Sequence, residues 1–166
     1  TINGTASNDL IRGYAGDDVI NAGDGNDVIY GGAGNDVINA GDGNDIIYGG
    51  VGADKLYGGA GNDTLVYDAS DTVIDGGTGL DTLLFASNAT VNLSGISDGK
   101  IESIEVLDMT KASIKMTLNP ADVLNITDDT HTVLKVLGGN DDTISGTGWT
   151  ASTDTTGLDV GFTRYE

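Results

Sequence analysis

The chain has 166 residues, among them 27 glycines, one proline and no cysteine. This length and composition suit one domain, or one repeat array with a cap, that has no disulfide to stabilise it. Its formal net charge of −19 excludes nucleic acid and anionic membrane surfaces as partners, because their phosphates would be repelled. No apolar run is long enough to cross a bilayer, so we expect no membrane insertion.

A nine-residue pattern repeats in phase through the first half of the chain. Residues 31–39 and 58–66 show it in nearly pure form, as Gly-Gly-x-Gly-Asn-Asp-x-aliphatic-x. Nine repeats cover residues 4–84, and the repeat at 67–75 is degenerate. Position six is filled by Asp9, Asp18, Asp27, Asp36, Asp45, Asp54, Asp63, Thr72 and Asp81. Position eight is filled by Ile11, Ile20, Ile29, Ile38, Ile47, Leu56, Leu65, Ile74 and Leu83.

The repeat predicts an all-β fold. Its six-residue Gly/Asn/Asp segment is typical of a turn, and the next three residues are strand formers. Because side chains alternate along a strand, the uniformly aliphatic position eight must face the interior. Two such files facing each other predict a right-handed parallel β-roll, a β-solenoid with two nonapeptides per coil, over residues 1–84. Its aliphatic core is thin, so we do not expect the roll to fold on packing alone.

The aspartates predict sites for a hard cation. Carboxylates and backbone carbonyls are the ligands of Ca²⁺, whereas zinc prefers His and Cys and Mg²⁺ fits pliable carbonyl-rich loops poorly. Equivalent loops recur every two repeats, which divides the aspartates between two edges of the roll. The first edge carries Asp9, Asp27, Asp45, Asp63 and Asp81, and the second edge carries Asp18, Asp36 and Asp54. We therefore predict several calcium ions in two ladders, each ion between neighbouring loops of one edge.

These copies of Gly-Gly-x-Gly-x-Asp-x-aliphatic-x resemble the RTX family of type I secreted bacterial proteins. The resemblance implies that each ion takes carbonyls from positions two and four of one loop, position one of the next loop, and aspartates from both. Gly32, Gly34 and Asp36 would thus act with Gly49 and Asp54. The carbonyl ligands implied in this way are Gly13, Ala22, Gly23, Gly25, Gly31, Gly32, Gly34, Ala40, Gly41, Gly43, Gly49, Gly50, Gly52, Gly58, Gly59, Gly61 and Gly76.

Two loops depart from the pattern. The loop 4–9 lacks two glycines, and the degenerate loop has Thr72 at the ligand position, although Asp71 is adjacent. Both departures weaken the sites at the ends of the ladders.

The second half, residues 85–166, is expected to be a β-rich continuation or cap. Strand-like runs occur at 90–93, 101–107, 114–118 and 133–137, and 119–124 suggests a short helical turn that starts with Pro120. Residues 101–107, 117–126 and 137–149 are similar to the segment that follows the repeats near the C-termini of large RTX adhesins. Trp149 and Phe162 are plausible capping side chains for the open end of the solenoid.

The sequence predicts no enzyme. It has none of the common nucleophile or metalloprotease motifs, and a lone His131 in a loop is far more typical of a surface residue than of a catalytic base. Glu102 and Glu105 would lie on opposite faces of one strand, so they make a poor catalytic pair. Outward side chains such as Tyr30 and Tyr48 form a ladder that either binds a partner or packs on the second half.

We therefore predict a calcium-dependent folding and secretion module near the C-terminus of a large type I secreted RTX adhesin. Calcium and the type I secretion machinery are the expected partners, and the bacterial cell surface or the extracellular medium is the expected location. Since Thr1 stands just ahead of a degenerate repeat, we expect a monomeric fragment of a larger chain. The alternative is a ligand-binding or ice-binding β-solenoid module of an adhesin, although position three lacks the threonine array of ice-binding repeats.

Overall fold

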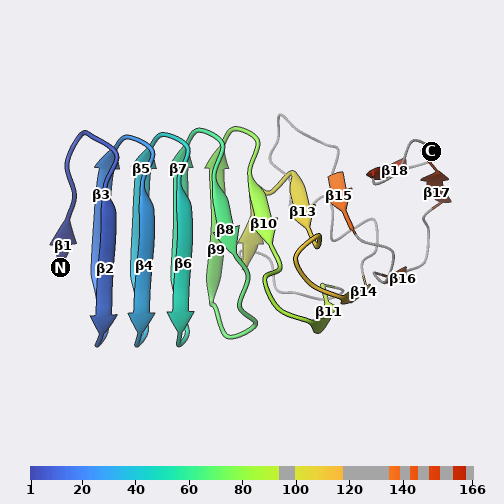
Figure 1. The fold of residues 1–166 in the computed structure, drawn as a ribbon, viewed down its shortest axis with the longest axis horizontal. Helices are drawn as coiled ribbons and strands as arrows, with labels where there is room; N and C mark the ends of the chain where they lie inside the picture. The colour runs from blue at the N-terminus through green and yellow to red at the C-terminus, as the bar shows by residue number, and fades with distance from the viewer. Residues whose placement is uncertain (94–99, 118–134, 139–142, 146–149, 154–158, 164–166) are drawn as a thin grey trace.

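The structure is a computed structural model that describes residues 1–93, 100–117, 135–138, 143–145, 150–153 and 159–163. Its strands stack side by side along one axis, which is horizontal in Figure 1, with the N-terminus at one end and the C-terminus at the other. The described residues contain strands and turns but no helix. Their parallel strands build a β-solenoid of about five turns, which confirms the predicted fold class, and among the described pairings only those of residues 159–163 are antiparallel.

Three sheets make up the solenoid. Sheet A contains β1 (Ile2–Asn3), β3 (Val19–Asp24), β5 (Val37–Asp42), β7 (Lys55–Ala60), β9 (Val73–Thr78) and β12 (Ile101–Glu102). Sheet B contains β2 (Leu10–Ala15), β4 (Val28–Ala33), β6 (Ile46–Val51), β8 (Thr64–Val66), β10 (Thr82–Leu84), β13 (Val106–Asp108), β15 (Lys135–Leu137), β18 (Asp159–Thr163) and β17 (Thr150–Thr153). Sheet C contains β11 (Ala89–Asn92), β14 (Ile114–Thr117) and β16 (Thr143–Ser145).

The register of the first two sheets follows the sequence repeat. Ile20 pairs with Ile38 in sheet A, and Ile29 pairs with Ile47 in sheet B, so each coil contains two nonapeptides. Position eight faces inward from both sheets, as predicted. Its fully buried members are Ile20, Ile29, Ile38, Ile47, Leu56, Leu65, Ile74 and Leu83.

The regular strands are longer than the sequence indicated. Most of them, such as β3 and β4, contain six residues rather than three. Position one points into the core behind position eight, where Ala22 and Ala40 are fully buried. Pairing then continues through positions two and three, as between Gly41 and Gly23 and between Asp42 and Asp24. The turn is therefore confined to positions four to six.

After β10 the coil widens from two strands to three. The chain leaves sheet B and forms β11 in sheet C before it returns to sheet A as β12. Val106 pairs with Thr82, 24 residues earlier, whereas coils in the repeats advance by 18. Figure 1 shows β11 and β14 displaced from the two sheets of the roll.

Some of the strands predicted for the second half are present in the structure, and one is not a single strand. Residues 90–93 and 114–118 coincide with β11 and β14. The run 101–107 is wrong as a single strand, because the chain turns a corner at residues 103–105 between β12 and β13. Ser103 has a φ of +53° at that corner, which directs the chain from sheet A into sheet B. Residues 119–124, His131 and Trp149 lie outside the described part of the chain, as does the side chain of Phe162.

Candidate metal centre

The position-six aspartates form two hydrogen-bonded ladders along the edges of the roll. Each backbone N–H donates to the Oδ1 of the aspartate in the next coil. On the first edge the Asp27 N–H donates to Asp45 Oδ1 at 2.7 Å, and the Asp45 N–H donates to Asp63 Oδ1 at 2.8 Å. On the second edge the Asp36 N–H donates to Asp54 Oδ1 at 2.8 Å. One oxygen of each carboxylate therefore fixes the spacing between neighbouring loops.

The other carboxylate oxygen points into a buried space. The Oδ2 atoms of six aspartates are buried and accept no hydrogen bond, namely Asp27, Asp36, Asp45, Asp54, Asp63 and Asp71. An ionised carboxylate is costly to bury unless it is paired with a cation. A row of buried acceptor oxygens without donors fits a hard cation such as Ca²⁺, which takes oxygen ligands.

Backbone carbonyls converge on the same space. A Cβ atom placed on Gly31 would lie 2.5 Å from Asp36 Oδ2 and 2.5 Å from the Gly49 carbonyl oxygen of the next coil. The corresponding point at Gly58 lies 2.4 Å from Asp63 Oδ2 and 2.4 Å from the Gly76 carbonyl oxygen. The structure thus brings together the position-six carboxylate and the position-one carbonyl of the next loop. The remaining carbonyl ligands, from positions two and four, stay a prediction.

The first loop differs from the others. Its carboxylate oxygen Asp9 Oδ2 accepts hydrogen bonds from the Thr5 N–H at 2.6 Å and the Thr5 Oγ1 at 2.9 Å. Asp9 and Asp18 are also only half-buried, because they lie at the N-terminal end of the stack. The first loop satisfies its carboxylate with its own threonine, in the place where the regular loops have glycine.

Burial disfavours the charged form of the ladder carboxylates when no cation is bound. Desolvation, with a smaller contribution from the neighbouring carboxylates of Asp81 and Asp45, raises the pKa of Asp63 to about 7, although the hydrogen bond from the Asp45 backbone lowers it. Burial also raises the pKa of Asp45 and of Asp54. The roll therefore holds its acids in a state that either a proton or a cation must neutralise.

The ladders end on two residues outside the pattern. At Thr72 the second edge continues through Asp71, whose Oδ1 accepts a hydrogen bond from the Asp54 N–H at 3.3 Å. On the first edge the Asp81 N–H donates to Glu105 Oε2 at 2.8 Å. Asp71 and Glu105 are 1% and 2% exposed, like the ladder aspartates. The sequence showed Asp71 beside the expected position, whereas Glu105 carried no signal because its loop has lost the glycines.

A second polar ladder runs beside the first in the opposite sense. On the first edge the Asn44 N–H donates to Asn26 Oδ1 at 2.8 Å, and the Asn62 N–H donates to Asn44 Oδ1 at 2.7 Å. Position five therefore accepts from the following coil, whereas position six accepts from the preceding coil. Together the two ladders give the backbone N–H of position five a partner in the preceding coil and that of position six a partner in the next coil.

Side chains alone do not complete a metal site in the described residues, where no group of three or more His, Cys, Asp or Glu residues is arranged to hold a metal ion. An ion in this structure would depend on a pair of carboxylates together with backbone carbonyls. That ligand type is the one that calcium loops use.

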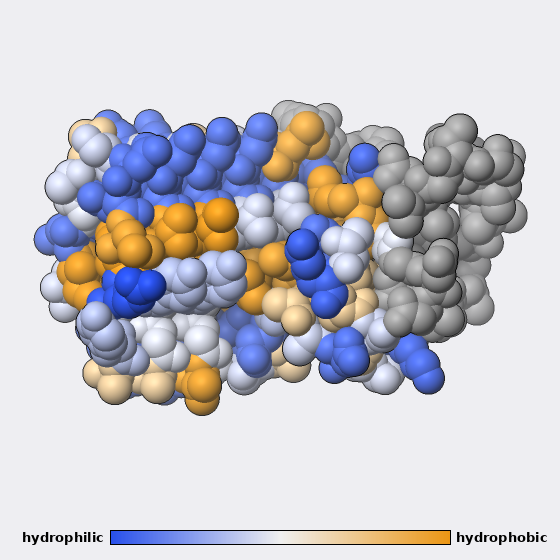
Figure 2. Space-filling model, in the orientation of Figure 1, coloured by the Kyte–Doolittle hydropathy of each residue, from blue (hydrophilic) through white to orange (hydrophobic). Residues whose placement is uncertain are grey.

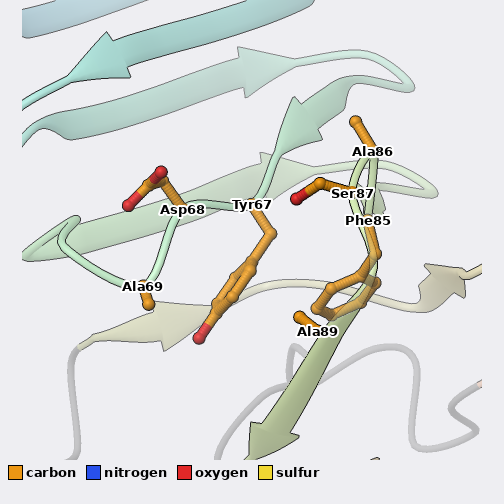
Figure 3. Close-up of a pocket in the computed structure, with 7 residues that line it drawn as sticks. All are labelled: Tyr67, Asp68, Ala69, Phe85, Ala86, Ser87 and Ala89. Carbon is orange, nitrogen blue, oxygen red and sulfur yellow. The ribbon is translucent and has the colours of Figure 1, made fainter. Parts of the chain in front are cut away.

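Two other surface features lie outside the ladders. A cavity of about 170 Å³ is present where the coil widens, and Figure 3 shows the Tyr67 and Phe85 rings on its walls, with centroids 4.9 Å apart. On the outward face of sheet B the Tyr30 and Tyr48 rings stack at 4.7 Å, and Arg12 lies 5.1 Å from the Tyr30 centroid. Figure 2 shows an apolar stripe across the first strands of the solenoid. No helix among the described residues could cross a membrane.

Comparison with known families agrees with the geometry of the ladders. Residues 1–29 and 30–65 match the family model described as RTX calcium-binding nonapeptide repeat (4 copies). No curated protein and no solved structure matches the chain. The matched repeat is a calcium-binding structural repeat and not an enzyme family. The match and the solenoid together support an RTX domain in the first half of the chain, with calcium as the implied ion.

Proposed function

We propose that this chain is a calcium-dependent folding and secretion module of a large type I secreted protein. The ladder carboxylates and the loop carbonyls would hold calcium ions between successive coils. The module would stay unfolded where calcium is scarce, as in the cytosol, and would fold after export. The resemblance of the second half to the segment that follows the repeats of large RTX adhesins favours an adhesin as the parent protein.

The buried, unpartnered Oδ2 atoms carry this proposal. A solenoid that stacks carboxylates in two rows, six of them with one buried oxygen that has no donor, is unstable without a counter-charge. Calcium supplies that charge, and its binding free energy then adds to the free energy of folding. Loop sites of about 10⁻⁴–10⁻³ M affinity are typical of extracellular modules. Such sites would be empty inside a cell and filled outside it.

The family match supports the export part of the proposal. RTX repeats occur in proteins that type I systems secrete, which suggests that this chain is exported to the cell surface or the medium. An unfolded acidic chain can thread a narrow channel, whereas a folded solenoid cannot. Folding outside would then prevent the chain from sliding back.

Circular dichroism of the purified chain with and without calcium tests the proposal. In chelator the regular coils should lose their β-structure, and added Ca²⁺ should restore it cooperatively. Mg²⁺ at the same concentration should not restore it. A chain that is folded in chelator, with a melting temperature that calcium does not change, would contradict the proposal.

A matched pair of variants tests whether calcium binds at the ladder aspartates. Asp36→Asn removes one buried carboxylate charge and keeps a side-chain oxygen to accept the Asp18 N–H. Asp42→Asn makes the same change at an exposed side chain on the outside of the roll. We expect a higher calcium midpoint for Asp36→Asn only, and equal midpoints for the two variants would argue against ladder binding.

A further inference from the structure

In the degenerate repeat, a carboxylate occupies the ladder position although the sequence has a threonine at position six. Thr72 occupies position six, but its side chain hydroxyl donates to the Asp54 carbonyl oxygen at 3.0 Å and is not part of the ladder. Asp71 is buried in its place, and its Oδ1 accepts the hydrogen bond from the Asp54 N–H. The ladder of the second edge is therefore continuous through this repeat.

A one-residue shift in the loop explains the exchange. In a regular coil one N–H reaches the position-six carbonyl of the coil before, as when the Lys55 N–H donates to the Asp36 oxygen at 2.8 Å. Here both the Thr72 N–H and the Val73 N–H approach the Asp54 oxygen, at 2.8 and 3.4 Å. Thr72 is thus an extra residue after the turn. Because Val73 still pairs with Lys55, 18 residues earlier, the turn itself is shorter by one residue. Within it Asp68 accepts hydrogen bonds from the Ser70 N–H and hydroxyl.

The carboxylates of Asp54 and Asp71 share the buried, unpartnered oxygen of a regular pair, although no carbonyl of the next coil lies as near to the Cβ point of Gly49 as the Gly49 carbonyl lies to that of Gly31. The Oδ2 atoms of both are buried and accept no hydrogen bond. A Cβ atom on Gly49 would lie 2.5 Å from Asp54 Oδ2, the distance that the same point on Gly31 has from Asp36 Oδ2. The Asp54 carboxylate therefore points into its loop as in a regular repeat. The Lys100 ammonium donates to the Ala69 carbonyl at 2.9 Å. The hydrogen bonds from Ser70, and to a smaller extent the Lys100 charge, lower the pKa of exposed Asp68.

We infer that Asp54 and Asp71 form a further divalent cation site, completed by the carbonyl oxygens of Gly50 and Gly52, within the repeat that lacks its aspartate. The inference rests on the proposed function and extends it to a residue that the repeat does not designate. It adds a site to the second edge, immediately before the coil widens. Calcium binding would then reach the boundary between the regular roll and the wider coils.

Calcium stoichiometry of Asp71→Asn tests the inference. Asparagine keeps an oxygen to accept the Asp54 N–H but removes the charge. We expect about one ion fewer per chain by equilibrium dialysis, and a calcium midpoint of folding raised about tenfold. Thr72→Ala, at the designated position, and Asp42→Asn, which makes the same charge change at an exposed site, should leave both quantities unchanged.

The sign of the stability change separates a ligand from a structural side chain. A ligand role predicts that Asp71→Asn destabilises the calcium-loaded chain and stabilises any structure that persists in chelator, because a buried charge is lost. Unchanged stoichiometry with greater stability in both conditions would overturn the inference, while calcium-dependent folding of the unsubstituted chain would leave the proposed function intact. If Asp71→Asn does not fold at any calcium concentration, Asp71→Glu should fold, and failure of both variants would overturn the inference as well.

Discussion

The regular coils and the wider coils belong to one solenoid but hold their turns in different ways. In the coils up to β10, each turn after that of Asp18 buries a carboxylate, and the buried charged residues of this region are Asp27, Asp36, Asp45, Asp54, Asp63, Asp71 and Asp81. In the described residues after β10, Glu105 is the only buried charged side chain. The turns and strands there bury large apolar side chains instead, namely Phe85, Val91, Leu93, Ile101, Ile104, Leu107, Met109, Ile114, Met116 and Val136.

The two regions differ in how they stabilise the turns between their strands. A coil with two short strands encloses one aliphatic residue per strand, which is too little apolar area to fix its turns. Under the proposed function, calcium ions bound at both edges would add charge–cation contacts to the regular coils. The wider coils enclose a larger cross-section and can fill it with apolar side chains. We therefore expect the first region to depend on calcium and the second to depend on packing.

Calcium removal should have the largest effect and should act on the regular coils. In chelator the amides of β3, β5 and β7 should exchange at the rates of an unfolded chain, because the stacked carboxylates then repel one another. Hydrogen-exchange mass spectrometry with and without calcium measures this. If these strands keep their protection in chelator, the regular coils are held by packing and the contrast between the regions disappears.

A methyl group at position four should disrupt a regular turn severely. Gly43 has a φ of +139°, and a Cβ there would lie 2.0 Å from the Gly25 carbonyl oxygen of the adjacent coil. Gly16 has a φ of +111° and nothing within 4 Å of its Cβ position. Gly16→Ala should cost about 1–2 kcal/mol from backbone strain. Gly43→Ala should cost about 1–3 kcal/mol more, as measured by thermal unfolding in saturating calcium.

Truncation of a buried apolar side chain in the wider coils should destabilise the chain without changing calcium binding. Ile104 is fully buried at the corner between β12 and β13, where a regular loop has its glycines. Ile104→Ala should destabilise the calcium-loaded chain by about 2–5 kcal/mol. The number of bound ions should not change, in contrast to Asp36→Asn. Loss of ions in Ile104→Ala would show that the corner also shapes a metal site.

The folded state of the calcium-free chain should become more stable as pH falls. A carboxyl whose pKa is about 7 in the folded state, such as Asp63, binds its proton more tightly than the ordinary carboxyl of the unfolded chain. The stability from this protonation is full below the unfolded pKa of about 4 and is lost as pH rises to about 7. In calcium-free buffer, β-structure should therefore increase between pH 7.5 and pH 5. Circular dichroism measures it, and a flat response would contradict the buried-carboxylate account.

With calcium present, the dependence on pH should reverse. Protons compete with the ion for the same oxygens, so the calcium midpoint should rise as pH falls over this range. A midpoint that does not depend on pH would mean that the ions bind elsewhere.

The smallest expected effect is that of the asparagine ladder. Asn44 Oδ1 accepts the Asn62 N–H at 2.7 Å on the exposed side of the turn. Asn44→Ala should cost about 1 kcal/mol and leave the number of ions unchanged. A large change in the calcium midpoint would show that this ladder also shapes the ion sites.

The sequence predicted the parts of the fold that repeat. The phase of position eight was sufficient to place Ile38 and Ile47 in the core, because a strand alternates its faces and the period never slips. The phase of position six placed Asp27, Asp45 and Asp63 on one edge for the same reason. The strands were predicted too short, since glycines at positions one and two resemble turn residues until the adjacent coil pairs with them.

Only the tertiary structure decided how the ladders end. At Asp71 the loop is shorter by one residue and an extra residue follows it, so position in the repeat no longer gives position in space. At Glu105 the loop between paired strands contains only residues 103–105, and a longer side chain reaches the backbone of Asp81. A regular repeat is a local property that a sequence displays directly. Which carboxylate faces inward after a change in loop length depends on the coil against which the loop is stacked.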